Sequence, residues 1–173
     1  MKRLILLRHA TAAWTENGGA DSDRTLTDVG RAECVAQANW LAASGHPPQH
    51  ALVSAATRAR ETWDIMREHL SPRPLYDVHE DLYLAEPDTL LAHIETLPDH
   101  AETAIVVAHN PGIENLARML SGVAPDVAAM RDMSRGYPTA GLGVFEMDVE
   151  SWEQLTVAQP RLTAFARPQV IVD

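Results

Sequence analysis

The sequence predicts an α/β protein in which a mostly parallel sheet is covered by helices on both faces, a three-layer α/β/α sandwich. Short apolar runs alternate along the chain with longer segments that have helix-capping residues at their ends. Residues 104–108 form a continuous apolar run, which is typical of a central parallel strand. Because the 173 residues contain no internal repeat, low-complexity segment or linker, we expect one domain over residues 1–173.

The predicted strands are short apolar runs, and the predicted helices are longer segments bounded by capping, glycine or proline residues. In chain order, these elements are a strand at 4–7, a helix at about 28–44, a strand at 51–54, a helix at about 57–70, a strand at 75–78, a helix at about 87–97, a strand at 104–108 and a helix at about 113–120. The polar residues 11–24 are typical of a loop.

Local chemistry sets the ends of the predicted helices. Thr27 is placed to cap the first helix, and Gly45 is placed to end it. Pro87 fits the first turn of the third helix, and Gly122 follows the end of the fourth. The apolar side of the first helix is predicted at Val29, Ala32, Ala36 and Trp40.

The last part of the chain predicts a hairpin followed by an irregular tail. Residues 141–147 and 152–157 are the expected strands, and residues 148–151 are the expected turn between them. We expect the chain after Pro160 to lie irregularly over the surface.

Composition and charge argue against several classes of function. Hydrophobic residues make up 46% of the chain and charged residues 22%, which are the values of a globular protein. The formal net charge of −10, from 24 acidic and 14 basic residues, argues against binding to nucleic acid or to an anionic membrane. Cys34 is the only cysteine and indicates a reducing compartment. The apolar run before Arg8 is too short for a secretion signal, so we expect a cytoplasmic protein.

Histidines and arginines follow three of the predicted strands. Arg8 and His9 come directly after the first strand, and Ser54 and Arg58 come at and after the end of the second. His109 follows the strong apolar strand that precedes it. Because ligands bind beyond the carboxyl ends of the strands in an open α/β sheet, we expect these side chains to converge on one edge.

This set of side chains suits phosphoryl transfer. A neutral imidazole is a competent nucleophile, and phosphorus is a suitable target for it. Guanidinium groups stay charged and bind phosphate oxygens with two parallel hydrogen bonds. Phosphoryl transfer depends on positioning and on charge neutralisation of the equatorial oxygens, which a second imidazole also serves. The residues therefore predict a mechanism through a phosphohistidine enzyme intermediate.

Each of these residues also has a purely structural interpretation. An Arg8-His9 pair after a strand is by itself more often a packing or surface feature. Arg58 lies among other charged residues and fits a solvated helix face with ion pairs. His109, before Asn-Pro-Gly, fits a turn. Taken together, the structural interpretations require three independent coincidences at the same edge of the sheet.

The remaining histidines do not predict a metal site. They are scattered through loops and helix surfaces, at His46, His50, His69, His79, His93 and His100. His46 and His50 have the spacing of a helical ligand pair, but Pro47-Pro48 between them excludes a helix. We therefore expect ordinary surface histidines, with no metal and no cofactor.

Other catalytic classes lack their signatures in this sequence. There is no Gly-x-x-x-x-Gly-Lys loop and no Gly-x-Gly-x-x-Gly fingerprint for a nucleotide. Ser54 does not lie in a Gly-x-Ser-x-Gly elbow, so serine hydrolase chemistry has no support.

Several segments, taken in order, resemble the histidine phosphatase superfamily and, within it, the SixA-type phosphohistidine phosphatases. Residues 6–10 read Leu-Leu-Arg-His-Ala and are similar to the Arg-His-Gly/Ala signature. Residues 21–30 resemble the Asp-x-x-Arg-x-Leu-Thr-x-x-Gly stretch of this branch, and residues 54–62 resemble its Ser-x-x-x-Arg-Ala-x-x-Thr segment. Residues 109–112 resemble the segment of the second histidine, and residues 137–140 also resemble this branch. The resemblance spans nearly the whole chain and implies a phosphoglycerate mutase-like fold.

The resemblance also implies roles for individual residues. His9 becomes the phosphorylated residue, and Arg8, Arg58 and His109 complete the phosphate pocket. Arg24 matches an arginine of this branch that also reaches the phosphate, so we expect it to bind substrate.

One departure from the family pattern concerns the general acid. Larger relatives carry a glutamate after the third strand, and the corresponding place here is about Leu84. The acids nearby are all out of register, at Glu80, Asp81, Glu86 and Asp88. An alkoxide leaving group needs a proton donor, whereas an imidazole, with an ordinary pKa of about 6.5, leaves with less help. The missing acid therefore favours phosphohistidine over a phosphate ester as the substrate.

Three functions remain open from the sequence. The first is a phosphatase that acts on phosphohistidine in a signalling protein, through a covalent intermediate on His9. The second is a phosphatase for a small phosphate ester, and the third is a non-catalytic module that binds phosphate. No residue pattern indicates an oligomer, so we expect a monomer.

Overall fold

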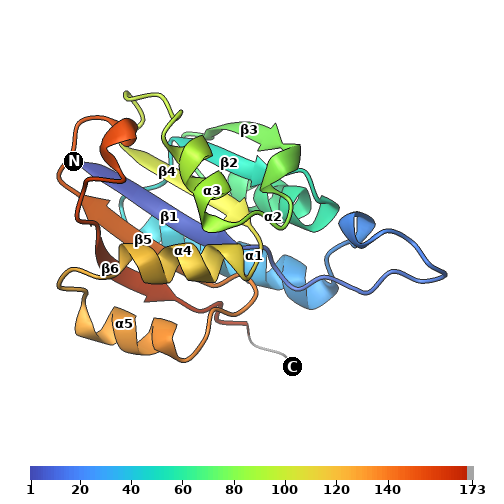
Figure 1. The fold of residues 1–173 in the computed structure, drawn as a ribbon. Coiled ribbons are helices and arrows are strands. Elements are labelled where there is room, and N and C mark those ends of the chain that lie inside the picture. The colour runs from blue at the N-terminus through green and yellow to red at the C-terminus, as the bar shows by residue number, and fades with distance from the viewer. Residues whose placement is uncertain (171–173) are drawn as a thin grey trace.

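The computed structural model describes residues 1–170 and has a six-stranded sheet at its centre (Figure 1). The strands lie in the order β3-β2-β4-β1-β5-β6. Their bounds are Lys2–Arg8 for β1, His50–Ser54 for β2, Leu75–His79 for β3, Thr103–Ala108 for β4, Leu142–Met147 for β5 and Arg161–Ala166 for β6. The first four strands pair in parallel, and β5 and β6 pair antiparallel at one side. The predicted α/β class and mostly parallel sheet are confirmed.

Helices cover both faces of this sheet (Figure 1). Their bounds are Asp28–Ala43 for α1, Thr57–Glu68 for α2, Pro87–Ile94 for α3, Gly112–Leu120 for α4 and Val127–Ser134 for α5. Short 3-10 turns stand at Asp21–Asp23 (η1), Glu80–Leu82 (η2) and Trp152–Gln154 (η3). None of the helices within residues 1–170 has the length and apolar character needed to cross a membrane.

Burial on both faces explains why the strands are continuous apolar runs. In β1, Leu4 and Leu6 pack into the core under α3 and α4, whereas Ile5 and Leu7 pack into the core under α1 and α2. All four side chains are almost completely buried. Alternate residues of one strand thus hold both helical layers on the sheet.

The buried side of α1 differs from the prediction. Thr27 caps the helix as expected, because its hydroxyl accepts a hydrogen bond from the Gly30 N–H at 3.0 Å. Val29 and Ala32, however, are exposed, and Ala36 and Trp40 are only half-buried. The helix instead buries Gly30, Glu33, Cys34, Gln37, Ala38 and Leu41. The pattern of apolar residues does not indicate this side of the helix, because two of its six buried residues are polar. Both of these bind backbone groups that are distant in sequence.

The C-terminal part also differs from the prediction. Residues 152–157 are not a strand, since Ser151 caps the short η3 turn and Trp152 is buried with its indole N–H donating to the Ala101 carbonyl at 3.0 Å. The chain after Pro160 is not irregular throughout, because Arg161–Ala166 forms β6 against β5. The helix α5, capped by Asp126, packs against β6 and was not predicted.

Close backbone contact fixes the start of α4 against the segment that precedes α3. A Cβ atom at Gly112 would lie 1.9 Å from the Ala85 carbonyl oxygen, so only glycine fits there. The Ile113 N–H donates to the His109 carbonyl at 2.9 Å, which ties the first turn of α4 to the end of β4. This contact therefore sets where His109 stands relative to Ala85.

We predict that Gly112→Ala lowers the free energy of unfolding by about 1–3 kcal/mol, because the added methyl group overlaps a buried carbonyl. Gly122→Ala is the matched control, since a Cβ atom there would meet nothing within 4 Å. Urea denaturation of the two variants and the wild type measures the effect. Equal stability of both variants would contradict the assigned contact.

Candidate active site

A cavity of about 510 Å³ opens at the carboxyl ends of β1, β2 and β4. Its lining includes all five residues that the sequence predicts for the site: Arg8, His9, Arg24, Arg58 and His109. Thr11, Ala12, Trp14, Asp21, Leu84, Asn110 and Thr139 complete it. The predicted convergence of Arg8, His9, Arg58 and His109 on one edge of the sheet is confirmed.

His9 lies at the centre of this cavity and is held by its backbone. Its N–H donates to the Ala108 carbonyl and its carbonyl accepts from the Ala140 N–H, both at 3.0 Å. The ring Nδ1 lies 2.8 Å from the Ala10 carbonyl oxygen, which only accepts, so Nδ1 carries the proton. Nε2 accepts from the Nε–H of Arg58 at 3.1 Å, so it carries a lone pair.

The second histidine stands beside the first. The ring centroids of His9 and His109 are 5.1 Å apart. His109 Nε2 lies 2.7 Å from the Ser54 hydroxyl, which comes from the end of β2, and the ring of Tyr83 meets the His109 ring edge-on at 5.4 Å. Within residues 1–170, no group pairs with the buried Nδ1 of His109.

Burial and positive charge keep both histidines neutral. Desolvation, with the nearby Arg58 and Arg8 guanidinium groups adding to it, lowers the pKa of His9 to about 4. Desolvation, with the neighbouring His9 and Arg58, lowers the pKa of His109 to about 3. At neutral pH the cavity therefore holds two uncharged imidazoles beside charged guanidinium groups.

The arginines enter the cavity from different elements. Arg58 lies in the first turn of α2 and is almost completely buried, with its NH1 donating to the Asp21 carbonyl at 2.8 Å. Arg8 ends β1, and its NH1 donates to the Tyr137 carbonyl at 3.0 Å. In the described part of the chain, the buried Nε of Arg8 has no partner.

Arg24 is held within the segment between β1 and α1, which extends away from the body of the fold (Figure 1). Its Nε donates to the Ala13 carbonyl at 2.8 Å, and its NH1 pairs with Asp21 at 3.2 Å. The guanidinium carbon lies 4.1 Å from the ring centroid of Trp14, whose side chain is 81% exposed. Arg24 and Trp14 thus form the outer rim of the cavity.

Sequence reasoning missed two residues at this site, Asp21 and Tyr83. The Asp21 carboxylate accepts from Arg58 NH2 at 3.1 Å and also from the Tyr83 hydroxyl. The hydrogen bond from Tyr83, with those from Arg24 and Arg58, lowers the pKa of Asp21 to about 2. Asp21 opens the segment that resembles the SixA-type branch, so its position was a usable signal, whereas nothing local marked Tyr83.

The place expected for a general acid is taken by a leucine. Leu84 lines the cavity, whereas the four nearby acids, at Glu80, Asp81, Glu86 and Asp88, are exposed and do not. Among the described residues that line the cavity, Asp21 carries the only carboxylate. Because the pKa of Asp21 is about 2, this carboxylate is ionised at neutral pH and does not donate a proton.

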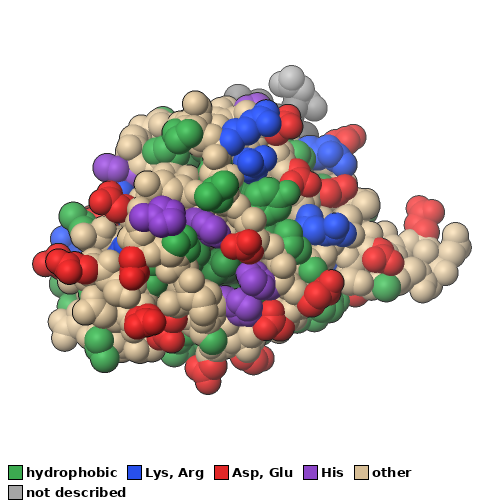
Figure 2. All heavy atoms as spheres, turned by 90° about the horizontal axis from the view of Figure 1, so that it is seen from above, with side chains coloured by type: hydrophobic (Ala, Val, Ile, Leu, Met, Phe, Trp, Pro, Cys, Tyr) green, Lys and Arg blue, Asp and Glu red, His purple; other side chains and the backbone are tan. Residues whose placement is uncertain are grey.

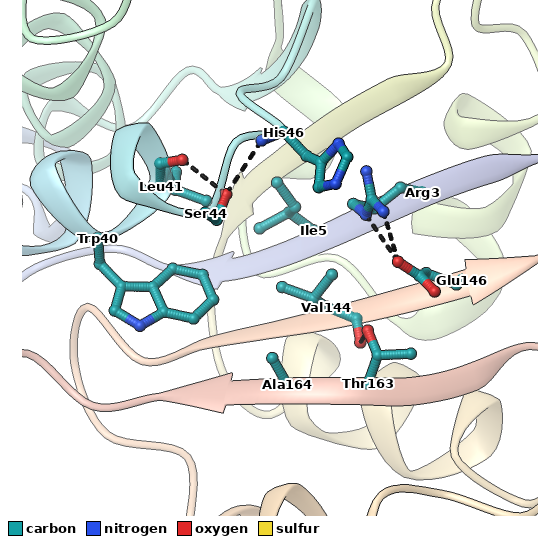
Figure 3. Close-up of a pocket in the computed structure, with 10 residues that line it drawn as sticks. All are labelled: Arg3, Ile5, Trp40, Leu41, Ser44, His46, Val144, Glu146, Thr163 and Ala164. Carbon is teal, nitrogen blue, oxygen red and sulfur yellow. Dashed lines mark hydrogen bonds and ion pairs between the residues drawn. The ribbon is translucent and has the colours of Figure 1, made fainter.

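A second hollow, of about 180 Å³, lies between α1 and the strands β1, β5 and β6 (Figure 3). Ile5, Val144 and Ala164 give it an apolar floor. The Nε of Arg3 donates to Glu146 at 3.0 Å at its end. Since the one arginine among its described lining residues is already paired, this hollow does not suit a phosphate group.

Comparison with known proteins gives relatives over nearly the whole chain. The model of the histidine phosphatase superfamily (branch 1) matches residues 4–89. An uncharacterised protein of Mycobacterium leprae is 30% identical over 166 residues, which are 94% of this chain and 100% of that protein. An uncharacterised chloroplastic protein of Arabidopsis thaliana is 36% identical over 132 residues, which are 71% of this chain and 61% of that protein.

Solved structures share the fold. A candidate phosphohistidine phosphatase SixA from Agrobacterium tumefaciens has a TM-score of 0.81 at 28% identity, over 96% of this chain and 98% of that chain. The protein histidine phosphatase SixA complexed with tungstate has a TM-score of 0.76 at 22% identity, over 96% of this chain and 97% of that chain. At 22% identity, the similarity to this second structure shows a shared fold and nothing more.

We predict that the two histidines make the protein less stable in acid. Their folded-state pKa values of about 4 and about 3 lie below the ordinary value of 6.5, so the unfolded chain binds protons first as the pH falls. Stability is therefore lost between pH 6.5 and about 4, by up to about 1.4 kcal/mol per pH unit for each histidine. Urea denaturation at pH 6.5 and pH 5 measures this loss.

The variant His9→Gln/His109→Gln separates this effect from the titration of carboxyl groups. We expect the double variant to lose about 2–4 kcal/mol less than the wild type between the two pH values. The same loss in both proteins would show that these histidines are not held neutral by the fold.

Proposed function

Because this chain belongs to the histidine phosphatase superfamily, and is a phosphatase by that membership, we propose that it hydrolyses phosphohistidine through a covalent intermediate on His9. The observation that carries the proposal is the hydrogen bond from Arg58 Nε to His9 Nε2. It joins an unprotonated imidazole nitrogen to a buried, fixed cation inside the cavity. We further propose that residues 1–173 form one such catalytic domain.

His9 is poised as a nucleophile at neutral pH. The bond from Nδ1 to the Ala10 carbonyl fixes the tautomer and the orientation of the ring, so Nε2 carries the lone pair. This lone pair accepts from Arg58 Nε–H, and it can attack phosphorus once that N–H turns to a bound phosphate oxygen. Because the pKa of His9 is about 4, almost every molecule carries the neutral imidazole at pH 7. The ring therefore needs no separate base to activate it.

The surrounding groups would neutralise charge on the transferring phosphoryl group. Arg8 and Arg58 present guanidinium groups from two elements, and an oxygen held between them would supply the partner that Arg8 Nε lacks among residues 1–170. If Ser54 donates to His109 Nε2, the Nδ1–H of His109 is available to another oxygen. Arg24 would complete the set from the rim.

The Asp21 carboxylate would hold these cations ready before substrate arrives. It pairs with both Arg58 and Arg24, at 3.1 Å and 3.2 Å, and so acts as a counter-ion where a phosphate group has to bind. Substrate binding then exchanges one anion for another of higher charge. This exchange avoids leaving unpaired buried guanidinium groups in the free enzyme.

The proposed reaction has two steps. His9 Nε2 attacks phosphorus and forms a P–N bond, while the bond from phosphorus to the substrate imidazole breaks. Its electron pair goes to the imidazole nitrogen, which takes up a proton. Water then attacks phospho-His9 and forms a P–O bond, while the P–N bond breaks and returns its electron pair to Nε2. Inorganic phosphate leaves, and the proton that the water gives up balances the proton that the imidazole took from solvent.

Two features favour phosphohistidine in a protein as the substrate. With Leu84 in place of an acid and Asp21 ionised, the lining that residues 1–170 provide offers no carboxylic acid to protonate an alkoxide, whereas an imidazole leaves readily. The exposed indole of Trp14 stands at the rim beside Arg24. An exposed aromatic side chain at the mouth of a site suits contact with the surface of a protein.

We predict that His9→Ala lowers kcat by at least about a thousandfold, because the covalent route is lost. The wild type, quenched after mixing with a phosphoramidate, should carry an acid-labile, base-stable phosphate that the variant lacks. His100→Ala, an exposed histidine outside the cavity, is the control and should behave like the wild type. Equal phosphate release by wild type and His9→Ala would overturn the mechanism.

We predict that kcat/KM is at least about a hundredfold higher on a phosphohistidine protein domain than on a phosphoserine peptide, because only the ester needs a donor acid. Initial rates of phosphate release from both substrates measure the ratio. A ratio near one, or a preference for the ester, would favour a small-molecule or general phosphomonoesterase instead.

A further inference from the structure

A group of metal-ligating side chains lies outside the cavity, at the edge of the sheet that β3 forms. His79 ends β3, Asp81 lies in η2, and His93 lies in the last turn of α3. One ligand atom from each residue lies within 4.8 Å of the other two. Seen from above, on the side where β3 lies in Figure 1, histidine side chains gather with acidic ones (Figure 2).

His93 contacts both of the other side chains. His93 Nε2 lies 2.8 Å from an Asp81 carboxylate oxygen, and the ring centroids of His79 and His93 are 4.3 Å apart. The hydrogen bond from His93 lowers the pKa of the Asp81 carboxyl group. Both imidazoles are half-buried, whereas Asp81 is exposed, so the group is formed by the fold yet open to solvent.

We propose that His79, Asp81 and His93 bind one divalent transition-metal ion, with Zn²⁺ as the ion of best chemical fit. Zn²⁺ accepts two imidazole nitrogens and a carboxylate oxygen as donors, whereas Mg²⁺ and Ca²⁺ favour oxygen ligands and do not favour the two imidazoles. Ligands bound to one tetrahedral Zn²⁺ at about 2.0–2.1 Å lie about 3.3 Å apart. The three ligand atoms, which lie within 4.8 Å of one another, would have to move closer together to reach that arrangement, and water would take the fourth position.

Two other places where a histidine has a close partner lack what a metal site requires. His50 Nε2 lies 2.7 Å from Asp77 on the same sheet edge, but no third ligand joins this pair among the described residues. His9 and His109 are close together, but the guanidinium groups beside them repel a cation. Only the group on β3, η2 and α3 combines three ligands with solvent access within residues 1–170.

Metal binding there would cross-link one wall of the active-site cavity. The residues between Asp81 and His93 include Leu84, which lines the cavity, and Tyr83, whose hydroxyl donates to Asp21. An ion bound to the end of β3, to η2 and to α3 fixes this segment at three points. We therefore expect bound Zn²⁺ to raise the melting temperature, because it binds the folded state selectively.

Calorimetric titration of the protein with Zn²⁺ in a non-chelating buffer tests the proposal. We expect one ion per chain for the wild type, and at least about tenfold weaker binding for His79→Ala and for His93→Ala. His50→Ala is the matched control, because it removes a histidine from a pair that lacks a third ligand, and it should bind like the wild type. His9→Ala should also bind like the wild type.

A second variant and a second measurement test the proposal if an alanine variant does not fold. Asp81→Asn keeps the shape of the side chain and should weaken binding too, and Co²⁺ bound to the wild type should give the intense visible absorption of a four-coordinate site. Absence of binding by the wild type would overturn the proposal. So would unchanged binding by both the His79 and the His93 variants, or binding lost only in His9→Ala. Phosphatase activity is not the readout, so the result is independent of the proposed reaction.

Discussion

The parallel pairing of β1 with β4 is the constraint on which the site depends. Its register sets Arg8 opposite Ala108, so the residues that follow the two strands emerge at the same height. The His9 N–H continues this pairing by donating to the Ala108 carbonyl. Two histidines a hundred residues apart in sequence thereby stand with ring centroids 5.1 Å apart.

The protonation state of the two imidazoles follows from their burial beside guanidinium groups. Burial and positive charge both disfavour the imidazolium form, so the fold prepares a neutral nucleophile at the expense of stability in acid. Asp21, in the segment outside the sheet, balances the charge of Arg58 and Arg24, and the Tyr83 hydroxyl donates to the same carboxylate. His9, Arg58 and Arg24 are thus connected through Asp21 in one network of hydrogen bonds, which Tyr83 joins.

The segment from His79 to His93 links the two proposals. It supplies Leu84 to the lining of the cavity and Tyr83 as a hydrogen-bond donor to Asp21, and none of its carboxyl groups lines the cavity. Its outer side carries His79, Asp81 and His93. The same segment therefore affects the proposed substrate preference through the residue that lines the cavity, and the proposed metal binding through residues outside the cavity.

The sequence by itself determined the strands β1 to β5, most helix ends and the polar side chains that meet at the sheet edge. Those features depend on local apolar runs, on caps such as Thr27, and on the rule that parallel strands end together. Only the tertiary structure decided the buried side of α1, where Glu33 bonds the Thr11 backbone N–H and Gln37 bonds the Ala140 carbonyl.

It also decided β6, the contact of Tyr83 with Asp21, and the group formed by His79 and His93. Each of these depends on partners that loops bring together from distant positions. The residues adjacent in sequence do not indicate such a partner, because the interaction between the two residues forms only when the chain has folded.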